Sequence, residues 1–196
     1  MRKAVSSAIA LLILAEALAA GSAARAETGC HESSDYLVVE RSRDDGFADF
    51  LVRKKTASST RIACAFSPQP KDFRPKESKP YGFSFVALSG RHLALEISDT
   101  NGTQVPRVRI YDLDKQSVLQ DIEDVFEIGE EASEKGFDFW VGSKTEPTKE
   151  NCPDYAEEIG AESSESQIVL LQKATFDFAS LKVVDSTEMK CVSWAD

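Results

Sequence analysis

The sequence has few of the residues on which many enzymes depend. It contains two histidines, His31 and His92, among 196 residues. No glycine-rich loop lies between an expected strand and a helix, which argues against a nucleotide cofactor. A Gly-x-Ser-x-Gly nucleophile elbow is also missing, so a catalytic triad would have to combine His92 with a residue such as Ser89. We interpret Ser89 and His92 as parts of an ordinary turn, and we expect no catalytic residues and no cofactor.

Metal-binding patterns are equally scarce. No two of the four cysteines have the short spacing of a zinc knuckle. The segment Asp99–Thr103 begins like a calcium-binding loop but lacks the later acidic ligands of that pattern. Its last three residues, from Asn101, also form a glycosylation sequon. We interpret this segment as an Asn-Gly turn and expect no metal site.

Long apolar runs are absent except at the N-terminus, where two basic residues precede the mostly apolar residues 4–20. Ala24 and Ala26 then supply the small side chains of a signal-peptidase site. The uninterrupted apolar core of this region is too short to span a bilayer. The sequence therefore predicts a signal peptide over residues 1–26, cleaved after Ala26. A single periplasmic or secreted domain, residues 27–196, would follow without a stable membrane span.

All four cysteines, Cys30, Cys64, Cys152 and Cys191, lie in the expected mature chain. An even number of cysteines in an exported protein indicates disulfide bonds. We favour Cys30–Cys64 with Cys152–Cys191, because each pair brackets a stretch that has the pattern of local hairpins. The two other connectivities stay open on the sequence alone.

Acidic residues outnumber basic ones, and the formal charge of the chain is −10. Removal of residues 1–26 takes away three basic side chains and one acidic one, which changes this charge to −12. Such a chain repels nucleic acid, and we expect a cationic protein or a cell-surface polymer as its partner. The charge is unevenly distributed, because residues 41–79 carry ten basic and five acidic side chains.

Apolar and polar residues alternate with a period of two after residue 34, which indicates β-strands. We expect about ten strands, at residues 36–39, 47–54, 61–66, 83–85, 93–97, 107–111, 118–128, 137–141, 167–178 and 181–194. The proline-rich segment 67–80 is predicted to be an extended loop, because proline lacks the N–H that a β-ladder needs. Residues 153–160 are predicted to form one short helix, since Pro153 suits its first turn and Gly160 its end.

These elements predict a mainly β fold, either a compact sandwich or an incomplete barrel. Aromatic side chains in alternating strands usually belong to the core rather than to a ligand groove. We therefore expect core positions for Phe137, Phe139, Trp140 and Trp194.

Two segments, residues 112–118 and 177–183, share the form of an acidic residue, an apolar residue and a turn. The stretch Phe85–Val118 resembles a pair of hairpins from a β-propeller blade. A complete propeller needs at least four blades, which about 170 residues barely hold, so a sandwich is the favoured architecture.

A second resemblance rests on short motifs spread over residues 81–194. They are Gly102-Thr103, Pro106-Arg107, Tyr111-Asp112-Leu113, Phe139-Trp140, Asn151-Cys152-Pro153 and Cys191. In these motifs the chain resembles a group of exported bacterial proteins of unknown function. The resemblance implies export and a β fold, and it carries over no activity or site.

We therefore expect a non-enzymatic exported binding or envelope protein. One alternative is an inhibitor of a basic enzyme such as a lysozyme, because Ser89-Gly90-Arg91-His92 resembles the Ser-Gly-x-x-Tyr loop of bacterial lysozyme inhibitors. Leu93 stands where that loop has its tyrosine. The other alternative is a hydrolase with two catalytic carboxylates. The acidic residues between 123 and 134 are interpreted as a solvated surface instead.

Overall fold

A computed structural model describes residues 27–56, 62–99, 101, 104–130, 132–152 and 166–195 of the chain. The protein is all-β, with eleven strands in two antiparallel sheets and no helix among the described residues. The first sheet contains β1 (Thr28–Glu32), β2 (Tyr36–Ser42), β3 (Ala48–Lys54), β4 (Tyr81–Ser89), β5 (His92–Asp99), β6 (Arg107–Asp112) and β7 (Ser117–Ile122). The second sheet contains β8 (Val125–Ile128), β9 (Gly136–Gly142), β10 (Ser166–Asp177) and β11 (Lys182–Ala195). The predicted mainly β, sandwich-like fold is confirmed.

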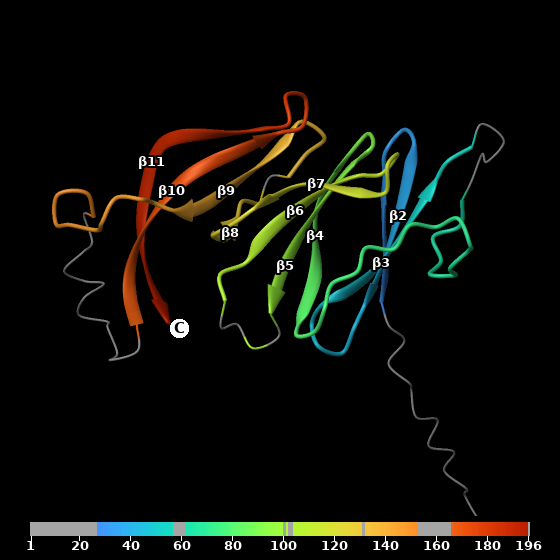
Figure 1. Cartoon of the computed structure of the whole chain (residues 1–196), viewed down its shortest axis with the longest axis horizontal. Coiled ribbons are helices and arrows are strands. Elements are labelled where there is room, and N and C mark those ends of the chain that lie inside the picture. The colour runs from blue at the N-terminus through green and yellow to red at the C-terminus, as the bar shows by residue number, and fades with distance from the viewer. Residues whose placement is uncertain are drawn as a thin grey trace, which may run out of the picture.

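The strands form three layers, each a meander of neighbouring strands. The first layer is β1–β3, the second is β4–β7 and the third is β8–β11. Strands β3 and β4 are joined by one residue pair, Ala48 with Phe83, whereas the other neighbours in this sheet pair over four or more positions. The sheet bends at this weak junction, so that β1–β3 packs against one face of β4–β7 (Figure 1). The second sheet, β8–β11, covers the opposite face of β4–β7. Figure 1 shows the three layers side by side.

The middle layer is buried on both faces, which explains its strongly apolar strands. On β5, Leu93 and Leu95 point to the core shared with β2 and β3, while Ala94 points to the core shared with the second sheet. All three side chains are fully buried. The largest side chains of the second core are aromatic rings from β9 and β10, and Phe137, Phe139 and Phe176 are almost completely buried.

The chain crosses from the first sheet to the second between β7 and β8. The sequence pattern predicted one continuous strand over residues 118–128, and this prediction is wrong. Asp124 has a φ of 56°, which interrupts the extended conformation. After it, the Val125 N–H donates to the Pro106 carbonyl, and β8 pairs with β9.

Both predicted disulfides are present. Cys30–Cys64 and Cys152–Cys191 have Cα–Cα distances of 6.0 and 5.8 Å. The first bridge also explains a wrong prediction, because residues 62–66 form no strand. Instead the disulfide fixes this segment over β2 and β3, where Ile62 and Phe66 pack on a small core. The third strand of the first layer is β1, which the sequence analysis missed.

The two hairpin turns that resemble one another in sequence also have similar conformations. The Asp112 carboxylate accepts hydrogen bonds from two following backbone N–H groups, and the Asp177 carboxylate accepts one. The fifth residue of each turn has a positive φ, 52° at Gln116 and 56° at Leu181. The second and third layers therefore use the same kind of turn at one hairpin each.

Three predictions fall partly or wholly outside the described residues. They are the signal peptide over residues 1–26, the short helix over residues 153–160 and the Asn101-Gly102-Thr103 turn, of which Asn101 is described. Within the described ranges, no helix is long and apolar enough to cross a membrane.

Candidate functional site

The candidate site is a cavity at the junction of β3 and β4, beside the point where Pro75 ends the pairing of a loop with β3. Val52 on β3 exchanges two backbone hydrogen bonds with Phe73, in the loop between the strands. Continuing that antiparallel register places Pro75 opposite Phe50. Proline has no N–H to donate, so the ladder ends there and the chain departs from β3 before β4 begins.

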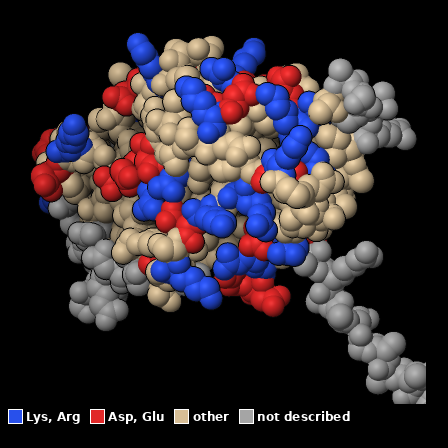
Figure 2. Space-filling view, turned by 45° about the vertical axis from the view of Figure 1, so that its right-hand side comes forward, with Lys and Arg blue, Asp and Glu red and all other residues tan. Residues whose placement is uncertain are grey.

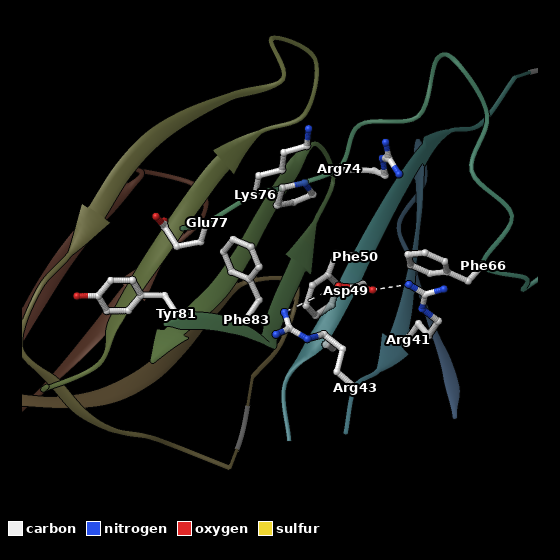
Figure 3. Close-up of a pocket in the computed structure, with 12 residues that line it drawn as sticks. Arg41, Arg43, Asp49, Phe50, Phe66, Arg74, Lys76, Glu77, Tyr81 and Phe83 are labelled. Atoms are coloured by element: carbon white, nitrogen blue, oxygen red, sulfur yellow. Dashed lines mark hydrogen bonds and ion pairs between the residues drawn. The ribbon is translucent and has the colours of Figure 1, made fainter. Parts of the chain in front are cut away.

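The resulting cavity has a volume of about 260 Å³. Figure 3 shows Phe50 and Phe83 between its two sides, with Arg74 and Lys76 on one side and Arg43 on the other. The rings of Phe50 and Phe83 contact each other edge to face, with centroids 6.4 Å apart. The cavity therefore has an apolar floor and a charged rim.

Basic residues around this cavity come in three pairs with the same spacing. Each pair has one residue between its members: Arg41 and Arg43, Arg74 and Lys76, Arg107 and Arg109. In an extended chain such a spacing places two side chains on the same side, roughly 6.6 Å apart along the backbone. We call these six residues the basic track. The face turned forward in Figure 2 shows Lys and Arg side chains gathered across its middle.

The Arg41 and Arg43 pair is held by two carboxylates, Asp49 and Asp45. Arg43 forms an ion pair and a hydrogen bond with Asp45. Arg41 forms an ion pair and a hydrogen bond with Asp49, and the Arg43 Nη1 atom lies 3.9 Å from the other Asp49 oxygen. The Arg41 guanidinium also lies over the Phe66 ring, 4.1 Å from its centroid. These contacts fix the direction of both guanidinium groups at the cavity.

The Arg107 and Arg109 pair is held by Glu77 and Asp121. Arg109 donates to Glu77 over 2.6 Å and makes a two-pronged contact with Asp121 at 2.7 and 2.9 Å. Hydrogen bonding from Arg109 lowers the pKa of Asp121, and the same contact raises the pKa of the Arg109 guanidinium. Arg107 lies 3.5 Å from Glu77 and over the Tyr81 ring. This pair is therefore largely neutralised.

The central pair differs from the other two. Arg74 and Lys76 are exposed, and the buried Pro75 lies between them. Within the described part of the chain, neither forms an ion pair. The Arg74 charge contributes to the lowered pKa of Asp72, but Asp72 is bound directly by Arg53. Both cationic groups at the cavity rim therefore remain available to contact an anion. Across the described ranges, no group of three or more potential ligands is arranged to hold a metal ion.

The structure places Ser89-Gly90-Arg91-His92, the segment that resembles the loop of lysozyme inhibitors, in the tight turn between β4 and β5. This loop is anchored by internal contacts. The Ser89 hydroxyl donates to the Glu134 carbonyl over 2.6 Å, and the Gly90 carbonyl accepts from Ser33 over the same distance. Arg91 lies 4.0 Å from Asp112. None of its residues lines the cavity at the basic track.

Both histidines are partly enclosed by aromatic rings. The His31 ring stacks on Phe85, and its Nε2 atom lies 3.0 Å from Glu40. The His92 ring lies parallel to that of Phe178, with centroids 6.4 Å apart. Burial lowers the pKa of His92, and the nearby positive charge of Arg91 lowers it further. Strand alternation alone does not reveal which side chains a neighbouring layer covers.

The aromatic predictions have mixed outcomes. Phe137 and Phe139 are buried core residues, as predicted. Trp140 and Trp194 are only half-buried. Lys190 lies over the Trp140 ring, and Trp194 packs edge to face on Phe126. The acidic residues described between 123 and 134 are exposed, in agreement with a solvated surface.

The positive charge of residues 41–79 is evident from the sequence, but the basic track is not among the sites predicted above. A usable signal was present, because each pair reads as basic-x-basic in the sequence: RSR, RPK and RVR. In a strand this spacing places both cations on one face. That the three pairs are neighbours in space depends on how the layers pack.

Comparison with known proteins adds no relative. No family model, no curated protein and no solved structure matches this chain.

Proposed function

We propose that this protein is a non-enzymatic exported binding protein, and that its basic track binds an anionic ligand. The observation that carries the proposal is the central pair, Arg74 and Lys76. Both cations are exposed at a cavity rim and lack an ion-pair partner in the described part of the chain. In a chain with a formal charge of −10, these two cations lie together at one cavity rim, beside two further basic pairs.

The proposal reverses the expected charge of the partner, from positive to negative. Net charge suggested a cationic protein, but a ligand at this cavity meets the local charge of the face. Because salt screens long-range fields beyond about 8 Å at physiological ionic strength, nearby groups outweigh distant ones. A negatively charged cell-surface polymer would be attracted by the local positive charge, and it belongs to one of the partner classes expected from the sequence. We propose this class of partner.

Export is the second part of the proposal. The two disulfides are consistent with a periplasmic or extracellular location. The basic and apolar N-terminal pattern supports a signal peptide cleaved after Ala26. The resemblance to exported bacterial proteins points in the same direction. The lysozyme-inhibitor and hydrolase alternatives stay predictions from the sequence, and no contact described above favours them.

The test is a binding titration with the purified exported chain. Two polyanions are used as probes, an oligogalacturonate and an inorganic polyphosphate, at about 50 and about 500 mM salt. We expect at least one probe to bind, with affinity that falls as salt rises. The double substitution Arg74→Ala/Lys76→Ala removes two charge-assisted contacts and is expected to weaken binding by about tenfold or more.

The matched control is Lys144→Ala/Lys182→Ala. It removes the same charge from two exposed lysines that do not line the cavity. If binding depends on net charge alone, the two double variants will lose affinity equally, and the proposed site is then wrong. Absence of binding to both probes would also contradict the proposal.

A further inference from the structure

The cavity contains two carboxylates as well as four cations, and this combination narrows the class of ligand. Resting on the proposed function, we infer that the cavity binds a single carboxylated sugar ring of an acidic polysaccharide. The cations on its rim bind the sugar carboxylate, and Asp49 and Glu77 accept hydrogen bonds from the ring hydroxyls. The rest of the polymer follows the basic track across neighbouring strands.

The size of the cavity favours one ring. Ligand pockets usually measure roughly 300 to 1,000 Å³, so a volume of about 260 Å³ lies just below that range. It accommodates one small ring and excludes a folded chain. A polymer must therefore place one unit in the cavity and keep its remaining units outside, where Arg107 and Arg109 lie.

The two carboxylates distinguish a sugar acid from a ligand that carries only negative charge. A carboxylate has about four lone-pair sites. Glu77 uses its oxygens for Arg107, Arg109 and its neighbour Ser78, and Asp49 uses its oxygens for Arg41 and Arg43. Sites remain for hydroxyl donors. A polyphosphate has no hydroxyl groups along its length, so it gains nothing from these carboxylates and is repelled by them.

The apolar surfaces of the cavity are suited to the faces of a sugar ring. Phe50 and Phe83 form the floor, and the half-exposed Tyr81 lies at the side. The Tyr81 hydroxyl donates to Gln104 over 2.7 Å, which fixes the ring orientation. Ligand pockets commonly combine such apolar walls with a few directed polar groups.

The experiment compares the same two probes, matched in the number of negative charges, and adds a neutral galactose oligomer. We expect the oligogalacturonate to bind about tenfold or more tightly than the polyphosphate, and the neutral oligomer to bind weakest. The diagnostic variant is Asp49→Asn, which keeps the size of the side chain and removes its charge. Polyphosphate affinity is expected to rise and oligogalacturonate affinity to fall, so that their ratio changes by about fivefold or more.

Failure of this inference is distinguishable from failure of the proposed function. If the polyphosphate binds equally well or better and Arg74→Ala/Lys76→Ala still weakens it, the sugar inference is overturned and the anion site stands. If Asp49→Asn raises both affinities equally, the carboxylate acts only through its charge, and the sugar inference is again overturned. If neither probe responds to the central pair, both proposals fall.

Discussion

Removing the disulfide between Cys152 and Cys191 tests how this fold is held together. The two cysteines are 39 residues apart in the chain. Closing a loop of that length lowers the entropy of the unfolded state, and the chain-entropy relation gives roughly 3.9 kcal/mol at 25 °C. The double variant Cys152→Ala/Cys191→Ala is expected to lose about that much, a large part of the 5 to 15 kcal/mol typical of a domain.

The assay is equilibrium unfolding in urea under non-oxidising, non-reducing conditions. The midpoint should fall, and the slope of free energy against urea should increase, because an uncrosslinked unfolded chain exposes more surface. The matched control is Cys30→Ala/Cys64→Ala, whose cysteines are 34 residues apart and whose expected loss is nearly the same, roughly 3.8 kcal/mol.

A loss below about 1.5 kcal/mol with an unchanged slope would contradict this expectation, since the bridge would then not act through the unfolded state. A second refutation comes from peptide mapping without reduction. Recovery of Cys64 linked to Cys152 would show a different connectivity.

Two other predictions concern the core and its pH dependence. Phe139 is fully buried between the second and third layers, and Phe139→Ala is expected to lower the free energy of unfolding by about 3 to 5 kcal/mol. Trp140→Ala, on the opposite face of the same strand, should lower it by no more than about half of that in the same urea assay. His92 has a pKa below its ordinary value of 6.5, so the unfolded chain takes up a proton first as the pH falls through about 6.5, and stability decreases toward the folded pKa. His92→Phe keeps a ring beside Phe178 and should reduce the loss of unfolding free energy between about pH 7.5 and about pH 5.5; an unchanged loss would show that His92 does not contribute to it.

The extended segments and their turns were largely predictable because they depend on neighbouring residues. The period-two pattern located most strands, and the final pair, predicted at 167–178 and 181–194, agrees closely with β10 and β11. The disulfide pairing was also predictable, since each bridge joins cysteines on either side of local hairpins.

The boundary between β7 and β8 was not predictable in the same way. Residues 118–128 keep a strand-like composition throughout, and one residue in a left-handed conformation, Asp124, redirects the chain to the second sheet. Likewise, residues 62–66 have the composition of a strand but lie over β2 and β3 because Cys64 is bonded to Cys30. In both cases a single position overrides the pattern of its neighbours.

The amino-acid sequence by itself determined the β class, most strands and the positive charge of residues 41–79, and it favoured the disulfide pairing that the structure has. The tertiary structure decided which charges are neighbours. Arg43, Arg74 and Arg107 come from segments separated by about 30 residues each, and they lie on one face because Pro75 ends a ladder and the first sheet bends beside it. Side-chain spacing within a strand is a local property, whereas contact between strands depends on the packing of whole layers.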